Sequence, residues 1–279
     1  MYKPERTRKL KNFFAPGINW LKHLFTYRIL IKEFFFRELK GKFAGSIGGL
    51  FWVVFTPISQ ILVYLFVFNT VFRIKLNALQ VGTSSFVLFF LSGIFPWLCF
   101  QEGISRCSTV LLENANLITK VQFPVEVLPT SALVTSFFIN SIGLGLFFIY
   151  MGVTGALKPS ILFFPIAYGL FFLFSVGLGH FLASITVFIR DVQHFVQIIL
   201  FIWFYLTPII YPLDMVPKDL LFIMKINPVL PFLELMRASI FGMDFRTGDI
   251  ILALAWTGIS FIGGLFIFQR LKGAFGDAL

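Results

Sequence analysis

Long apolar stretches separated by short polar ones dominate the chain. A helix needs about 20 apolar residues to cross the hydrocarbon core of a bilayer. Five stretches reach or approach this length: 47–72, 127–151, 161–189, 195–212 and 250–268. A sixth, "FVLFFLSGIFPWLCF" at 86–100, is short, but a helix from about Thr83 through Ser105 would cross, because a proline can kink a membrane helix without ending it. The pattern predicts six spanning helices, with both termini on one side.

The composition agrees with this pattern. Of 279 residues, 58% are hydrophobic, 40 are phenylalanine and only 13% are charged, which is too apolar for the surface of a soluble domain of this size. The first 28 residues are basic and mixed, and they lack the short apolar core of a secretory signal. We therefore expect the N-terminus to stay in place.

The distribution of basic residues predicts the orientation, because Lys and Arg near span ends remain cytoplasmic. With the N-terminus inside, sixteen of the 23 Lys and Arg lie on the inner side, eleven of them in residues 1–46. The opposite orientation would leave only seven inside. Both termini are therefore expected to be cytoplasmic.

Two segments between the spans carry further information. Residues 106–126 are long enough for a short helix that lies across the inner membrane face. Residues 213–248 are too apolar for a free outer loop, so we expect two short re-entrant helices, broken at Asn227-Pro228 and at Pro231. The expected fold is an all-α integral membrane protein in three parts: a cytoplasmic basic arm with an interfacial helix (1–46), a six-helix transmembrane domain (47–269) and a cytoplasmic tail (270–279).

A charged helix is predicted directly before the first span, over residues 28–43. Glu33 with Arg37 and Glu38 with Lys42 are acid-before-base pairs four residues apart, a spacing that stabilises a helix. We interpret this segment as a helix in the plane of the membrane interface. The alternative is a solvated basic arm that anionic lipids hold.

Glycines follow this helix at positions 41, 45 and 49, which would share one helical face. Small residues at this spacing allow the backbones of membrane helices to approach closely. Gly48-Gly49 would also permit a bend, so the segment is interpreted as an elbow before a tightly packed first span. The alternative is that the glycines merely tolerate a turn.

Motifs for catalysis are missing from the sequence. It contains no G-x-x-x-x-G-K-[ST] phosphate loop, no metal-binding cluster, no G-x-S-x-G elbow and no paired carboxylates in a span. Of the polar residues expected inside spans, only His180 is ionisable, and we interpret it as a hydrogen-bonded packing residue rather than a proton relay. Gln60 and Asn140 fit hydrogen bonds between helices as well as they fit a pore lining. An enzyme is therefore poorly supported.

Aromatic residues are frequent, and the run "FIWFY" at 201–205 is one of several. Most such rings face lipid or fill helix contacts, but planar apolar rings also suit the C–H faces of a sliding glycan. Trp203, Phe204 and Tyr205 are therefore candidates for an aromatic pore lining.

Four stretches together resemble the membrane permeases of polysaccharide-exporting ABC transporters, a type-2 permease family that includes O-antigen, capsule and teichoic-acid exporters. They are "RELKGKFAGSIGGLFWVVFTP" (37–57), "NANLITKVQFPVEVLP" (114–129), "RDVQHFVQIILFIWFYLTPIIYP" (190–212) and "NPVLPFLELMRASIFG" (227–242). The resemblance extends over roughly residues 25–270. The resemblance implies no role for the basic segment of about 25 residues before it, which we interpret as an anchor to the inner leaflet.

The resemblance implies an O-antigen exporter in the bacterial cytoplasmic (inner) membrane. The permease would pair with a second copy of itself and with two copies of a cytoplasmic ATP-binding subunit, and it would move a lipid-linked polysaccharide. ATP and Mg would bind to that partner subunit, no cofactor would bind to this chain, and membrane lipids but no nucleic acid would contact it.

The resemblance also implies roles for individual residues. A coupling helix at about 108–125 would dock on the ATPase through Glu113, Asn114, Asn116, Leu117, Lys120, Phe123 and Pro124. The helix before the first span resembles a gate helix, and its candidates for binding the lipid diphosphate are Arg28, Lys32, Arg37, Lys40 and Lys42. Glu234 and Arg237, in the segment that resembles the re-entrant helices, are expected to pair with each other.

Two other functions remain open from the sequence. The first is a type-2 permease for a hydrophobic drug or lipid, which would use the same machinery for another substrate. The second is a membrane-bound lipid or sugar transferase, which would act without an ATPase and for which no acid or nucleophile cluster is visible.

Overall fold

A computed structural model describes residues 17, 20, 22, 24–42, 45–49, 51–73 and 76–279. These residues form helices and no β-strand, so the predicted all-helical fold is confirmed. The helices are α2 (Arg28–Lys42), α3 (Phe51–Leu65), η1 (Phe66–Val71), α4 (Ala78–Val81), α5 (Phe86–Glu113), α6 (Ala115–Lys120), α7 (Val127–Val153), η2 (Pro159–Phe163), α8 (Phe164–Phe188), α9 (Val192–Leu206), η3 (Leu213–Met215), η4 (Lys218–Leu220), α10 (Leu221–Ile226), α11 (Leu230–Phe241), α12 (Thr247–Leu271), η5 (Lys272–Ala274) and α13 (Phe275–Ala278).

Five helices in the described part of the chain are long and apolar enough to cross a membrane. They are Phe51–Phe68, Phe86–Glu113, Val127–Val153, Pro159–Phe188 and Thr247–Ala278. The stretch at 86–100, which looked short in sequence, belongs to a helix of 28 residues that continues through Pro96. This helix begins after Ser85, whose side chain accepts a hydrogen bond from the backbone N–H of Leu88.

The expected span at 195–212 is shorter than its apolar sequence suggested. Helix α9 has 15 residues and ends at Leu206, and the next residue, Thr207, is extended. Pro208 explains this ending, because a proline disfavours helical backbone in the residue before it. The count of six spans therefore stays a prediction.

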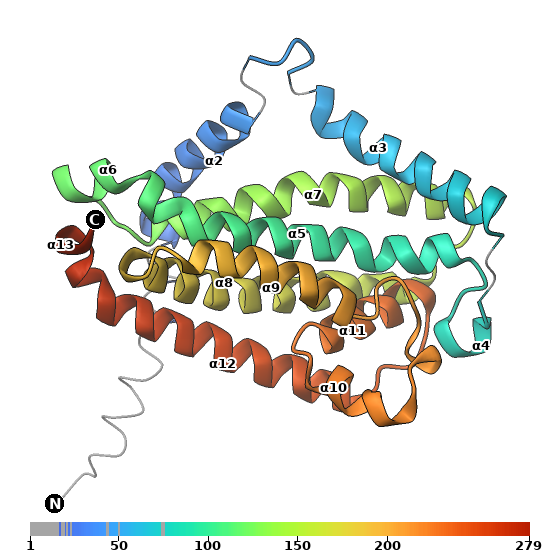
Figure 1. The fold of residues 1–279 in the computed structure, drawn as a ribbon. Helices are drawn as coiled ribbons and strands as arrows, with labels where there is room; N and C mark the ends of the chain where they lie inside the picture. Colours follow the sequence, from blue (N-terminus) through green and yellow to red (C-terminus); the bar gives the residue numbers. More distant parts are fainter. Residues whose placement is uncertain are drawn as a thin grey trace, which may run out of the picture.

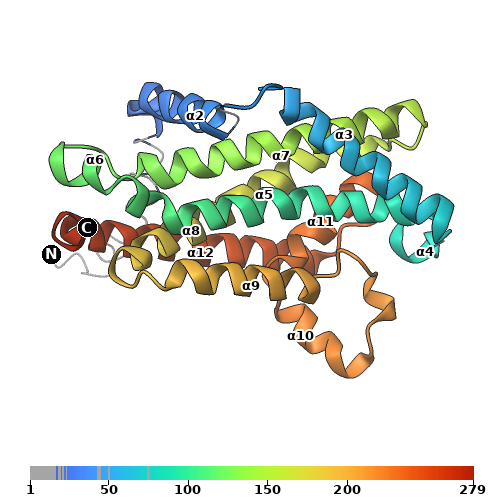
Figure 2. The same cartoon turned by 45° about the horizontal axis from the view of Figure 1, so that its top comes forward.

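Helices α5, α7, α8, α9 and α12 run side by side along the length of the molecule (Figures 1 and 2). At one end lie α6, α13 and the C-terminus, and at the other end lie α4 and α10. We call these the α6 end and the α10 end. Helix α5 is central, with 78% of its most apolar window buried, whereas α3 lies at the edge with 11% buried.

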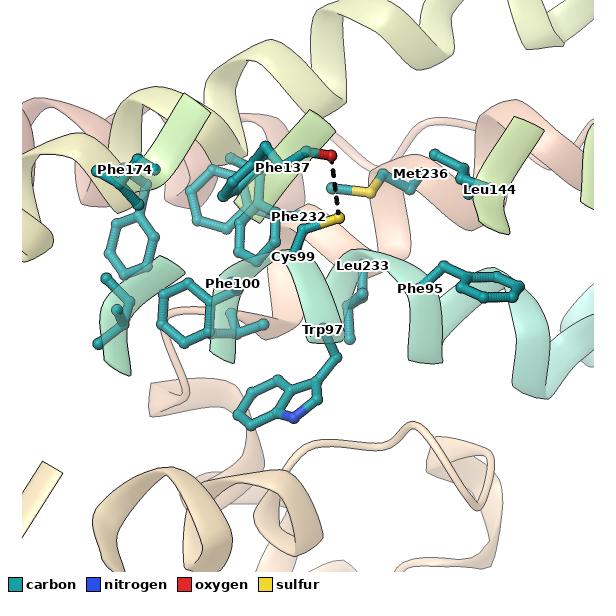
Figure 3. Close-up of a cluster of buried hydrophobic side chains, with 14 of the residues drawn as sticks. Phe95, Trp97, Cys99, Phe100, Phe137, Leu144, Phe174, Phe232, Leu233 and Met236 are labelled. Atoms are coloured by element: carbon teal, nitrogen blue, oxygen red, sulfur yellow. Dashed lines mark hydrogen bonds between the residues drawn. The ribbon is translucent and has the colours of Figure 1, made fainter. Parts of the chain in front are cut away.

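Aromatic side chains from several helices form the core around α5. Figure 3 shows Phe95, Trp97, Cys99 and Phe100 of this helix among side chains of α7, α8 and α11. The ring centroids of Phe100 and Phe174 lie 5.9 Å apart, in a stacked arrangement that stabilises the contact beyond the area it buries. Every residue of α11 except Glu234 is buried, so protein covers this short helix.

The segment before the last span contains two short α-helices, as predicted, and the 3-10 turns η3 and η4 precede them. Helix α10 ends at Ile226, directly before the break expected at Asn227-Pro228, and α11 follows. The break expected at Pro231 is wrong, because this proline lies in the first turn of α11. Its missing N–H would have no partner within the helix there, so it does not interrupt the helix.

The glycines after α2 form the expected elbow but not the expected helical face. Gly45 and Gly49 have φ angles of 77° and 49° in turns, and a Cβ atom at either would meet nothing within 4 Å. The close helix contact lies elsewhere, between α8 and α12. There a Cβ at Gly264 would overlap the backbone carbonyl of Gly177, and a Cβ at Gly177 would overlap that of Ser260.

Candidate functional site

A cavity of about 500 Å³ lies between α2, α5 and α7 towards the α6 end. Its walls combine opposite charges with small polar groups, and we call it the charged cavity. Its lining residues are Arg37, Glu38, Gly41, Lys42, Glu102, Arg106, Glu113, Asn114, Thr135, Ser136 and Ile139.

Helix α2 forms one wall of this cavity because its two buried residues attach it to different parts of the fold. Phe34 packs against Phe123 in the segment after α6, with ring centroids 5.3 Å apart. Leu39 packs against Val53 of α3 and Ile139 of α7. The helix thus bridges the α6 segment and the first span.

The charged residues of α2 do not pair with each other as the sequence predicted. Neither Glu33 with Arg37 nor Glu38 with Lys42 forms an ion pair among the described residues. Instead, Arg37 donates a hydrogen bond of 2.9 Å to the side-chain oxygen of Asn114, directly before α6. Helix α2 is therefore linked to other elements by side chains that were expected to stabilise it internally.

Lys42 is linked in the same way, to the middle of α5. Its Nζ lies 2.7 Å from Oε1 of Glu102, and Asn140 of α7 donates a 2.9 Å hydrogen bond to Oε2 of the same carboxylate. Glu102 thus joins three helices. The expectation that only His180 is ionisable inside a span is wrong, because Glu102 lies in α5, within the helix from Thr83 through Ser105 that the sequence predicted.

Arg106 organises the other carboxylates of the charged cavity. It lies 3.0 Å from Glu113 and 3.9 Å from Glu38. Burial raises the pKa of Glu38 above its usual range, although the charge of Arg106 opposes this shift. The pKa of Glu38 is raised in the folded state. Ionisation of Glu38 therefore weakens the packing of α2 against the rest of the protein as the pH rises through that pKa.

A second cavity, of about 270 Å³, adjoins the charged cavity along α3. Lys42, Glu102 and Ile139 line both cavities, so the ion pair lies at their junction. Trp52 and Phe95 also line the second one, which we call the aromatic cavity; its remaining lining residues are Val53, Thr56, Pro57, Gln60, Leu98 and Asn140. The two polar residues that the sequence singled out, Gln60 and Asn140, therefore share one cavity.

The five basic residues proposed for diphosphate binding occupy different surroundings. Arg37 and Lys42 line the charged cavity. Arg28, Lys32 and Lys40 are exposed on α2 and do not line it. Sequence reasoning missed Glu38, Glu102 and Arg106 as members of the site; the signal for Glu102 was a carboxylate within the predicted extension of the second span.

The expected coupling segment contains a helix of only six residues, α6. Glu113 is the last residue of α5, and Asn114 separates the two helices. Asn116 and Lys120 are exposed, whereas Leu117 and Phe123 pack against the core. Pro124 is also partly buried, so the seven candidates divide into those that face outward and those that attach the segment to the fold.

The aromatic candidates on α9 also face different ways. The indole N–H of Trp203 donates a 2.8 Å hydrogen bond to Asn227, and the ring of Phe204 lies 5.8 Å from that of Trp97. Both therefore pack towards α5 and the segment before α11. Tyr205 is 52% exposed, and its ring contacts those of Phe201 and Phe204 on the same helix.

At the α10 end, a third cavity of about 940 Å³ includes the predicted pair Glu234 and Arg237. The pair forms, with 3.4 Å between Oε1 and Nη1. The guanidinium of Arg237 also lies 3.8 Å from the centre of the Phe89 ring, a cation–π contact that favours the buried charge. The ion pair lies within α11, and the contact of Arg237 with Phe89 joins α11 to α5.

His180 behaves as a packing residue. It is buried, and a ring nitrogen lies 3.3 Å from the hydroxyl of Thr130 on α7. The other ring nitrogen lies 2.8 Å from the carbonyl oxygen of Val176. Both nitrogens thus have partners within the protein, as the interpretation from the sequence required.

Comparison with known families matches residues 30–241 to the ABC-2 type transporter family. The chain belongs to this family. An ABC-2 type transporter chain is a multi-pass membrane protein, in agreement with the five long apolar helices of the described residues.

Relatives of this ABC-2 type transporter chain include proteins named for polysaccharide export. The O-antigen export system permease protein RfbA of Myxococcus xanthus is 28% identical over 269 residues, which cover 94% of this chain and 100% of the relative. The protein of the same name from Klebsiella pneumoniae is also 28% identical, over 93% of this chain and 97% of its own. The polysialic acid transport protein KpsM of Escherichia coli is 20% identical, over 88% and 95% respectively.

Proposed function

We propose that the chain is the channel-forming permease subunit of an exporter that moves a lipid-linked polysaccharide across the bacterial cytoplasmic membrane. The substrate that we propose is O-antigen. Two copies form the passage, both termini of each are cytoplasmic, and two separate subunits bind ATP with Mg and hydrolyse it. The observation that carries this proposal is the similarity to O-antigen export permeases over the whole length of those relatives.

In this proposal the parts of the chain divide the work. Residues 1–46 form a basic arm and a gate helix, residues 47–269 form the transmembrane domain, and residues 270–279 form a cytoplasmic tail. Helix α2 contacts the segment around α6 through Phe34 and Arg37. Movement that an ATPase imposes on α6 would therefore reach the gate helix directly.

The diphosphate of the lipid carrier binds at the charged cavity in this proposal. Arg37 and Lys42 supply charge-assisted hydrogen bonds, which are stronger than neutral ones. Arg28, Lys32 and Lys40 are exposed on the same helix, and they attract the anionic headgroup to it. The adjoining aromatic cavity, with Gln60, Asn140 and Trp52, offers polar groups and rings to the first sugars.

The substrate is tested against the main alternative, a hydrophobic drug or lipid, with the permease and its ATPase reconstituted in vesicles. We expect a lipid-diphosphate-linked O-antigen to stimulate ATP hydrolysis and to become accessible to a lectin on the opposite side. A hydrophobic drug should do neither. Stimulation by the drug alone would favour the alternative, and turnover of a substrate by the permease without ATPase would contradict both.

The exposed face of α6 is expected to recruit the ATPase. Replacing Asn116 and Lys120 by glutamate changes the charge of this face without altering the buried contacts of Leu117 or Phe123. Buried interface anchors commonly contribute enough for a loss of about tenfold or more in affinity. We expect this loss when ATPase co-purification is measured.

The control is Lys158→Glu, which makes the same charge change as Lys120→Glu, at an exposed position lining the cavity of the α10 end. It should leave recruitment unchanged. Equal recruitment by the α6 variant and this control would show that the ATPase docks elsewhere.

A further inference from the structure

The strongest feature that the proposed function leaves unexplained is the carboxylate of Glu102. It lies eleven residues before the end of α5, which places it about 16 Å along the helix from that end. An ionised side chain at such a depth in a spanning helix is costly, and such residues commonly mark a substrate path. Glu102 also lies at the junction of the charged and aromatic cavities.

The charges around the charged cavity are balanced without a substrate. Three cationic residues, Arg37, Lys42 and Arg106, face three carboxylates, Glu38, Glu102 and Glu113. Arg106 contacts Glu38 and Glu113, whereas the ion-pair partner of Lys42 is Glu102. An anion that takes the place of this carboxylate at Lys42 therefore competes with Glu102.

We propose that Glu102 is a built-in competitor that keeps the phosphate groups of ordinary phospholipids off Lys42 and yields to the diphosphate of the lipid-linked substrate. This inference rests on the proposed function, whose diphosphate site it deepens. Breaking the ion pair between Lys42 and Glu102 costs the same free energy for every incoming anion. A phosphodiester with one negative charge attracts Lys42 about as strongly as Glu102 does, so it gains little by replacing the carboxylate. A diphosphate with two negative charges attracts Lys42 more strongly.

The surroundings of Glu102 allow this exchange. Its second oxygen accepts a hydrogen bond from Asn140, so the carboxylate keeps a partner when Lys42 turns to another anion. The side chains of Lys42 and Glu102 are 41% and 31% exposed, so an anion in either cavity can reach them. Lys42 is also the last residue of α2, where a long side chain has freedom to reorient.

The test measures binding of a polyprenyl diphosphate to the full-length protein in bilayer discs. One set of discs contains phosphatidylcholine alone, whose choline balances the charge of its phosphate. The other also contains phosphatidylglycerol, whose phosphate charge is not balanced within the headgroup. For the wild type we expect the same affinity in both. For Glu102→Gln we expect tighter binding in phosphatidylcholine, and a loss of about tenfold when phosphatidylglycerol is added.

Glu33→Gln is the matched control, because it removes a carboxylate from the exposed surface of α2 and Glu33 does not line the charged cavity. It should resist phosphatidylglycerol like the wild type. Glu102→Asp, which keeps the charge but shortens its reach, should show a smaller loss and allows the test if Glu102→Gln does not fold. Equal affinities of Glu102→Gln in both discs would overturn the inference. Failure of the wild type to bind the diphosphate in phosphatidylcholine would instead overturn the proposed diphosphate site.

Discussion

Replacing Gly264 by alanine is expected to destabilise the protein more than any other single methyl group added to α12. The new Cβ would overlap the backbone carbonyl of Gly177 on α8, and a backbone atom cannot move away by changing a rotamer. The two helices must therefore separate. Overpacking of this kind typically costs about 1–3 kcal/mol, which corresponds to a melting temperature lower by roughly 2–10 °C.

Gly263→Ala is the control for this prediction, because a Cβ at the neighbouring position meets nothing within 4 Å. Alanine also favours a helix over glycine by about 1 kcal/mol, so this variant should be at least as stable as the wild type. Both variants are compared by thermal unfolding in detergent and by size-exclusion chromatography. If the two melted at the same temperature, the tight contact between α8 and α12 would be wrong.

The sequence predicted the helices well because their signals are local. Apolar length located the spans, and Asn227-Pro228 marked the break before α11. The errors also have local causes that are clear in retrospect. Pro208 ends α9 because it disfavours helical backbone at Thr207. Helix α5 continues through Pro96, and Pro231 lies in the first turn of α11, where it does not interrupt the helix.

The site was harder to predict because its contacts join residues far apart in sequence. Lys42 has Glu38 one helical turn before it but pairs with Glu102, and nothing in the local pattern distinguishes these partners. The glycine contact has the same origin: the spacing of Gly41, Gly45 and Gly49 was correct for a packing face, but the backbone turns there. The ion-pair partner of Lys42 and the turn after α2 depend on how α2 lies against α5 and α7.

The residue roles that the family resemblance implied can now be separated by their surroundings. Asn116 and Lys120 are available to a partner, whereas Phe123 attaches the α6 segment to α2 through Phe34. Arg37 reinforces this attachment through Asn114 and stacks its guanidinium 4.0 Å from the centre of the Phe34 ring. In the proposed function, Phe34 is therefore the residue on which the contact between the α6 segment and the gate helix α2 most depends.

We accordingly expect Phe34→Ala to uncouple export from ATP hydrolysis. Phe34 is buried, with 7% exposure, and truncation of a buried phenylalanine costs about 3–5 kcal/mol. Helix α2 should leave the α6 segment, while the exposed face of α6 keeps Asn116 and Lys120 for the ATPase. In reconstituted vesicles, ATPase recruitment should remain and export of the lipid-linked glycan should fall to background.

The matched control is Phe36→Ala, which removes the same ring from the same helix two residues later. Phe36 is 41% exposed and its ring contacts that of Phe35 on the same helix, so this variant should retain most of its export activity. The variants differ only in which face of α2 loses a ring. If Phe34→Ala exported as much glycan as Phe36→Ala, the force from ATP would reach the passage by another route. If Phe34→Ala instead failed to bind the ATPase, α2 would be needed to hold α6 in its docking position.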